Sequence, residues 1–176
     1  FATPFLLPKT RDALTPWQKP ALLALLSICL IPLLAATGKA VSGVWGPLDT
    51  LPYGGEHPHQ GLLTHLWLYG RASGGGSFPA GHASGGFALM SLYYLPLTRR
   101  WRAALLLLGF AAGWGMGLYQ MARGEHFLSH TLTTLCLAFW IITALAQRLG
   151  LQTSAHSPFS LNNEDATLRN CYNLLH

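Results

Sequence analysis

Three apolar runs of 17 residues, each without a charged residue, constrain this chain more than any other feature. They cover residues 21–37, 103–119 and 131–147. Each is close to the roughly 17–25 apolar residues that a helix needs to cross a bilayer. Only 10% of the 176 residues are charged, whereas about 25% is typical of soluble domains. The runs therefore predict an all-α, multi-pass transmembrane helical bundle.

The basic residues separate into two sets along the chain. One set flanks alternating ends of the apolar runs and comprises Lys9, Arg11, Lys19, Arg99, Arg100, Arg102 and Arg148. By the positive-inside rule, these ends are expected to be cytoplasmic. The opposite ends carry Lys39, Arg71 and Arg123, on the side where positive charge is usually avoided, which suggests that these three serve a function. The net charge of +5 forms no single patch, so we expect no nucleic-acid partner.

The stretch Phe78-Pro79-Ala80-Gly81-His82 lies between a glycine-rich loop and an apolar segment. Proline at a first helical position predicts that a helix begins there and continues through residues 83–97. The first turn of a helix has free N–H groups and partial positive charge, which suit an anion such as phosphate. His82 would add a proton donor. The alternative is an ordinary loop-to-helix junction.

A second polar segment, residues 120–130, separates the last two apolar runs. Its Arg123 can bind phosphate oxygens with two parallel hydrogen bonds, and Lys39 can add a point charge. His126 can act as a nucleophile toward phosphorus, and His82 can protonate the leaving oxygen. This scheme needs no metal and no cofactor. The convergence of separate segments on one outer face predicts a functional site there.

These residues resemble signatures of the type 2 phosphatidic acid phosphatase superfamily, which includes vanadium haloperoxidases. The stretch ending at His82 is similar to its Pro-Ser-Gly-His signature. The signature Ser-Arg-x5-His-x3-Asp aligns its histidine with His126, its arginine with Gln120 and its aspartate with His130. Lys39 matches the lysine of Lys-x6-Arg-Pro, whose Arg-Pro is replaced at best by the distant His57-Pro58. The form of the last segment resembles a bacterial membrane branch of the family.

The resemblance implies hydrolysis of a phosphomonoester or pyrophosphate on a lipid, in a pocket at the outer edge of the membrane. It implies that His126 is the nucleophile and His82 the acid, with His130 or Glu125 orienting His126 in place of the aspartate. The predicted phosphate-binding residues are Lys39, Arg123, Gly81, Ala80 and His57. Ala80 replaces the usual serine, which removes one hydroxyl contact to phosphate.

We predict one membrane-embedded domain over residues 1–150 and a polar cytoplasmic tail over 151–176. Further spans are expected upstream, because the chain begins at Phe1 without methionine. The predicted location is a bacterial inner membrane with the site facing the periplasm. The predicted partners are the bilayer and a lipid phosphate substrate, whose identity stays open, as does the oligomeric state.

Other interpretations remain open at this point. The chain could be non-catalytic, as a pseudo-phosphatase, a headgroup- or metal-binding protein or a transporter component. His126 and His130 have the spacing of two metal ligands on a helix, although they complete no zinc-enzyme motif. Cys29 and Cys136 lie in apolar runs and are expected to be buried free thiols, together with an unpaired Cys171. The apolar piece Leu62–Tyr69 is too short to span a bilayer and is expected to be re-entrant or interfacial.

Overall fold

The computed structural model describes residues 8–59, 61 and 74–151, and these contain helices and no strand. The elements are α1 (Pro8–Ser42), η2 (Pro47–Asp49), η3 (Leu51–Tyr53), α3 (Gly81–Ala88), η5 (Leu89–Tyr94), α4 (Arg99–Ala122) and α5 (Leu128–Arg148). Helices α1, α4 and α5 are long and apolar enough to cross a membrane. The prediction of an all-α transmembrane bundle is therefore confirmed. The piece Leu62–Tyr69 and nearly all of the predicted tail lie outside the described residues.

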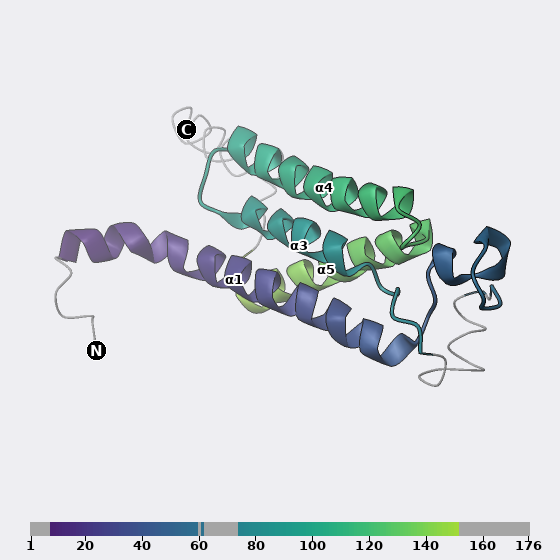
Figure 1. The fold of residues 1–176 in the computed structure, drawn as a ribbon. Coiled ribbons are helices and arrows are strands. Elements are labelled where there is room, and N and C mark those ends of the chain that lie inside the picture. The colour runs from purple at the N-terminus through teal and green to yellow at the C-terminus, as the bar shows by residue number, and fades with distance from the viewer. Residues whose placement is uncertain (1–7, 60, 62–73, 152–176) are drawn as a thin grey trace, which may run out of the picture.

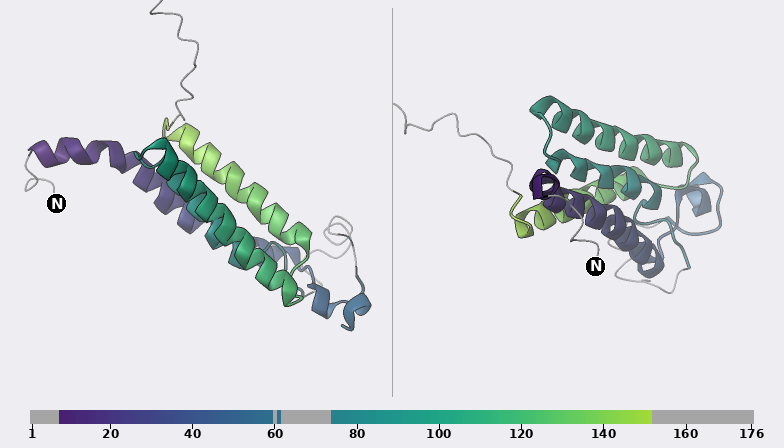
Figure 2. Two further views of the ribbon diagram at one scale, coloured as in Figure 1. Left: turned by 90° about the horizontal axis from the view of Figure 1, so that it is seen from above. Right: turned by 90° about the vertical axis from the view of Figure 1, so that its left-hand side faces the viewer.

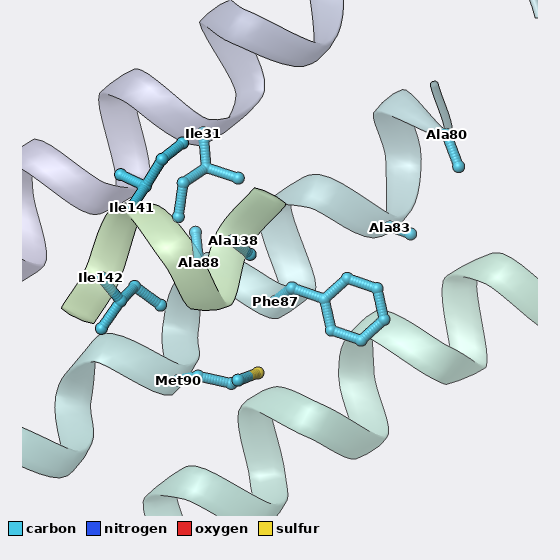
Figure 3. Close-up of a cluster of buried hydrophobic side chains, with 9 residues drawn as sticks. All are labelled: Ile31, Ala80, Ala83, Phe87, Ala88, Met90, Ala138, Ile141 and Ile142. Atoms are coloured by element: carbon cyan, nitrogen blue, oxygen red, sulfur yellow. The ribbon is translucent and has the colours of Figure 1, made fainter. Parts of the chain in front are cut away.

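The short helix α3 is the centre of the bundle. It contacts α1, α4 and α5, and the 3-10 helix η5 continues it between the same neighbours (Figures 1 and 2). A cluster of buried side chains from α1, α3, η5 and α5 fills the interior (Figure 3). Phe87 and Ile31 are its largest fully buried members. The three long helices thus surround α3, whose second residue is His82.

Two glycines bring α3 and α4 into direct backbone contact. A Cβ atom on Gly86 would lie 2.3 Å from the backbone nitrogen of Gly113. A Cβ atom on Gly113 would lie 2.2 Å from a ring carbon of Phe87. Small residues at such crossings allow helices in a membrane to pack closely, where no hydrophobic effect drives them together.

We expect Gly86→Ala to lower the free energy of unfolding by about 1–3 kcal/mol, the usual effect of overpacking a tight contact. The new methyl group would meet the backbone of α4, which cannot rotate away as a flexible side chain can. Unfolding of the purified protein in detergent measures the change. Gly85→Ala is the matched control, because Gly85 is exposed and a Cβ there meets nothing within 4 Å. An equal decrease in the free energy of unfolding of both variants would show that the close α3–α4 contact at Gly86 is not the cause.

The helix that carries His82 differs from its prediction in both its limits. We expected it to begin at Pro79, but Ala80 is its N-cap residue, with φ −72° and ψ 97°, and the helix begins at Gly81. The α-helix then ends at Ala88 and continues as 3-10 helix to Tyr94, instead of remaining α-helical to residue 97. His82 still lies on the first turn, one residue after the start.

The cysteines were predicted to be free and buried, and the structure confirms only the first part. Cys29 and Cys136 are free thiols, but both are exposed. They lie on surfaces of α1 and α5 that no other part of the described chain covers and that suit contact with lipid. Cys171 lies outside the described residues.

The two ends of the bundle differ in charge and polarity. Arg99 begins α4 and Arg148 ends α5 at one end, where Arg102 donates a hydrogen bond of 2.8 Å from Nε to the carbonyl oxygen of Tyr93. At the other end, the last turn of α1, the start of α3, the end of α4 and the start of α5 come together (Figure 1). That second end contains the candidate site.

Candidate active site

A polar pocket lies where these four helix ends meet. Its volume is about 210 Å³, several times the roughly 30 Å³ that one water molecule occupies in the liquid. It is lined by Lys39, Gly76, Ser77, His82, Gln120, Arg123, Glu125 and His126. The lining has three kinds of group: two cationic side chains, two imidazoles, and hydrogen-bonding groups that include one carboxylate. This is a suitable composition for binding an anion.

The start of α3 is fixed in place by hydrogen bonds from two other helices. Ser42 at the end of α1 donates its hydroxyl to the carbonyl oxygen of Phe78 at 2.6 Å. Thr134 of α5 donates its hydroxyl to the carbonyl oxygen of Ala80 at 3.2 Å. The Ala80 N–H in turn donates to the carbonyl oxygen of His130 at 3.4 Å. These bonds set the position of His82, which is the second residue of α3.

The turn between α4 and α5 is fixed in a similar way. Gly124 has φ +73°, a left-handed conformation that residues with a side chain rarely adopt. Its carbonyl oxygen accepts a hydrogen bond of 3.0 Å from the N–H of Leu48. Leu48 belongs to the segment 43–59 that follows α1, which we call the outer loop. A Cβ atom on Gly46 would lie 2.6 Å from the carbonyl oxygen of Glu125, so this loop and the turn are in direct contact. The contacts place Arg123 and His126 on either side of the turn.

His126 is nearly covered although it lines the pocket. Its exposed fraction is 4%, and neither ring nitrogen has a hydrogen-bond partner within the described part of the chain. Burial lowers the pKa of His126 from its ordinary value of 6.5, and the positive charge of Lys39 lowers it further. The ring is therefore neutral at pH 7, with a lone pair on one nitrogen. A buried imidazole without a partner is available to react with, or bind to, a group that enters the pocket.

His130 lies next to His126, in the first turn of α5. The two ring centroids are 5.7 Å apart, and the rings are tilted by 59°. His130 also contacts Phe78 and Phe127 edge to face, with centroids 5.3 Å and 5.5 Å away. It packs against the ring of His126 and does not hydrogen-bond to it, because both nitrogens of His126 lack partners among the described residues.

The two cations approach the pocket differently. Lys39 is in the last turn of α1 and is half-buried, and a Cβ atom on Gly81 would lie 3.2 Å from its Cε. Arg123 is more exposed and forms an ion pair with Glu125, with 3.6 Å between Nη2 and Oε1. An exposed ion pair of this kind contributes little to stability. The guanidinium can therefore leave this carboxylate and bind a phosphate with only a small loss of free energy.

The structure brings together five of the nine residues for which the sequence predicts a role in the site. They line one pocket, although they come from separate segments, and they are Lys39, His82, Arg123, Glu125 and His126. The other four, His130, Gly81, Ala80 and His57, are not in the lining. Ala80 is fully buried, and the ring of His57 stacks on Trp45 with 3.7 Å between centroids. Roles for these four in catalysis or phosphate binding stay predictions.

Sequence reasoning missed the part that Gln120 plays in the pocket, since it treated this residue only as a replacement for an arginine. Gln120 lines the pocket, is 4% exposed, and has its Nε2 2.6 Å from Nδ1 of His82. No signal in the sequence links two residues that are 38 positions apart. The lining residues Gly76 and Ser77, next to the glycine-rich loop, were also missed.

The described ranges contain no group of three His, Cys, Asp or Glu side chains with the arrangement of a metal site. His126 and His130 are near each other, but no third ligand of these types joins them in this part of the chain.

The chain is similar to known proteins over most of the described helices. A family model described as the PAP2 superfamily matches residues 20–153. A curated lipid A 4'-phosphatase from Francisella tularensis subsp. novicida (strain U112) is 33% identical over 75 residues, which cover 41% of this chain. The matched part is 34% of that relative, so the similarity extends over about a third of its length. No solved structure gives a significant match.

Proposed function

Because this chain belongs to the PAP2 superfamily, we propose that it hydrolyses a phosphomonoester or pyrophosphate on a lipid. One observation carries the proposal: Lys39, His82, Arg123 and His126 surround one pocket at the end of a bundle suited to a membrane. A lipid anchored in the bilayer can bring its headgroup to that end without leaving the membrane. The similarity to a lipid A 4'-phosphatase supports a lipid substrate.

In the proposed reaction, a ring nitrogen of His126 attacks phosphorus and the bond to the leaving oxygen breaks. His82 gives a proton to that oxygen, and a phosphohistidine forms. Water then attacks phosphorus, His82 takes a proton from this water, and the P–N bond breaks to release phosphate. Lys39 and Arg123 stabilise the charge on the phosphoryl oxygens in both steps.

The location of His126 supports its role as the nucleophile, since its lowered pKa keeps a lone pair available at neutral pH. His130 packs against the ring and would limit its rotation, as an orienting residue does. The proposed location is a bacterial membrane with the pocket on the periplasmic side. This orientation follows from the basic residues at the opposite end of the bundle.

The experiment that tests this function measures phosphate release from a panel of lipids in detergent micelles. The panel contains phosphatidic acid, phosphatidylglycerophosphate, undecaprenyl pyrophosphate and lipid A. We expect release from at least one lipid, at the same rate with and without a metal chelator, because the proposed chemistry uses only side chains. Headgroup binding without any release would contradict it and would favour a pseudo-phosphatase, for which the replacements at Gln120 and His130 provide a reason.

A further inference from the structure

Gln120 and His82 form a part-buried contact on the wall of the pocket. Gln120 lies near the end of α4, with an exposed fraction of 4%, and His82 lies on the first turn of α3. The distance between Gln120 Nε2 and His82 Nδ1 is 2.6 Å. The other amide atom of Gln120, Oε1, is buried and has no partner within the described part of the chain. The contact occupies one of the two nitrogens of His82.

We propose that Gln120 is a positioning residue for His82 that supports both its charged and its neutral form. The inference rests on the proposed function, in which His82 first gives and later takes a proton. By binding Nδ1, Gln120 leaves Nε2 as the nitrogen that exchanges protons with the substrate and with water.

The chemistry of the amide explains how one residue can support both forms. An amide nitrogen only donates, so with Nε2 of Gln120 facing the ring, Nδ1 of His82 acts as the acceptor in this contact. The charged form has a proton on Nδ1 and needs an acceptor there. A half-turn of the amide brings Oε1 to that place, because the two ends of the amide are nearly the same size. Gln120 can therefore pair with Nδ1 whether or not that nitrogen carries a proton.

The proton balance of the proposed reaction is consistent with this arrangement. Charged His82 gives the proton on Nε2 to the leaving oxygen and keeps the proton on Nδ1, which Oε1 accepts. Nε2 then has a lone pair and takes a proton from the attacking water, which restores the charged form. Gln120 gains and loses no proton at any step.

The identity of residue 120 matters because the family signature has arginine at this position. A guanidinium has five donors and no acceptor. Placed 2.6 Å from Nδ1, it would oppose the charged form of His82. Glutamine is neutral and offers both a donor and an acceptor. Glutamine at this position is therefore compatible with His82 as its partner in either protonation state of Nδ1.

The test is an NMR titration of the full chain in detergent, labelled with 15N on histidine, with the His82 signal assigned through His82→Gln. In Gln120→Glu the added carboxylate only accepts and is negative, so we expect the protonation midpoint of His82 to rise by about one pH unit or more. Gln147→Glu is the matched control, since Gln147 is exposed at the opposite end of the bundle, and it should leave the midpoint unchanged. An unchanged midpoint in Gln120→Glu would overturn the proposal.

Kinetics on a lipid that the wild-type chain hydrolyses supply the second measurement. Gln120→Leu removes both the donor and the acceptor, and we expect kcat to fall by about 10- to 100-fold while KM changes less than about twofold. A rise in KM as large as the fall in kcat would show that Gln120 binds phosphate directly, which would overturn the proposal. The NMR midpoint needs no turnover, so it decides the role of Gln120 even if no lipid is hydrolysed.

Discussion

Replacing His126 with alanine is expected to reduce kcat for phosphate release by at least ~10⁴-fold, the scale seen when a catalytic nucleophile is removed. The reason is geometric as well as chemical. His126 is the buried imidazole of the pocket, and both its ring nitrogens lack partners within the described residues. No second nucleophile with these properties lines the described pocket, because His82 is exposed and engaged by Gln120. Phosphate release from lipid micelles measures the effect, and trapping with 32P-labelled lipid should detect an acid-labile phosphohistidine only in the wild-type chain.

His59→Ala is the matched control for this experiment. His59 is an exposed histidine of the outer loop, 5.1 Å from Phe127 between ring centroids, and it is not in the pocket lining. We expect this variant to keep wild-type activity. Both variants should insert into membranes and purify alike. Turnover retained in His126→Ala would show that another group attacks phosphorus.

The second large loss of activity is expected when Lys39 is replaced. Methionine has a similar length but no charge, so Lys39→Met keeps the stem that packs on Gly81 and removes the ammonium group from the pocket. One donor that stabilises transition-state charge is typically worth ~10²–10³-fold in rate. We expect kcat/KM to fall by this amount, with most of the loss in kcat.

Lys19→Met is the control for the charge itself. Lys19 is an exposed residue of the same helix, about five and a half turns earlier and far from the pocket. It should leave kcat/KM unchanged, because its charge is screened by salt at that distance. Equal activity of Lys39→Met and the wild type would remove Lys39 from the phosphate site.

The spans of this fold could be predicted from the sequence because lipid imposes a local rule. A segment in hydrocarbon must satisfy its own backbone hydrogen bonds, so residues 103–119 and 131–147 had to be helical wherever their neighbours lay. The limits of α3 depend instead on its partners. Ala80 is extended because its N–H and carbonyl oxygen bond to α5. The sequence near Pro79 contains no sign of those bonds.

The candidate site likewise has a part that could be predicted from the sequence and a part that could not. The histidines and cations were predictable because few other side chains can attack or bind phosphate, and because their charges lie on the less basic side of the bundle. The contact between Gln120 and His82 was not, since it depends on how α3 packs against α4. That packing is set by Gly86 and Gly113, whose closeness appears only when both helices are in place.

The residues that line the pocket lie at or next to helix termini at one end of the bundle, instead of midway along the helices. The two products of the proposed reaction would therefore leave by different routes. Inorganic phosphate can diffuse straight into the aqueous compartment, while the lipid alcohol returns sideways into the leaflet that supplied it. Neither departure requires the long helices to separate, so turnover can proceed with the transmembrane scaffold unchanged.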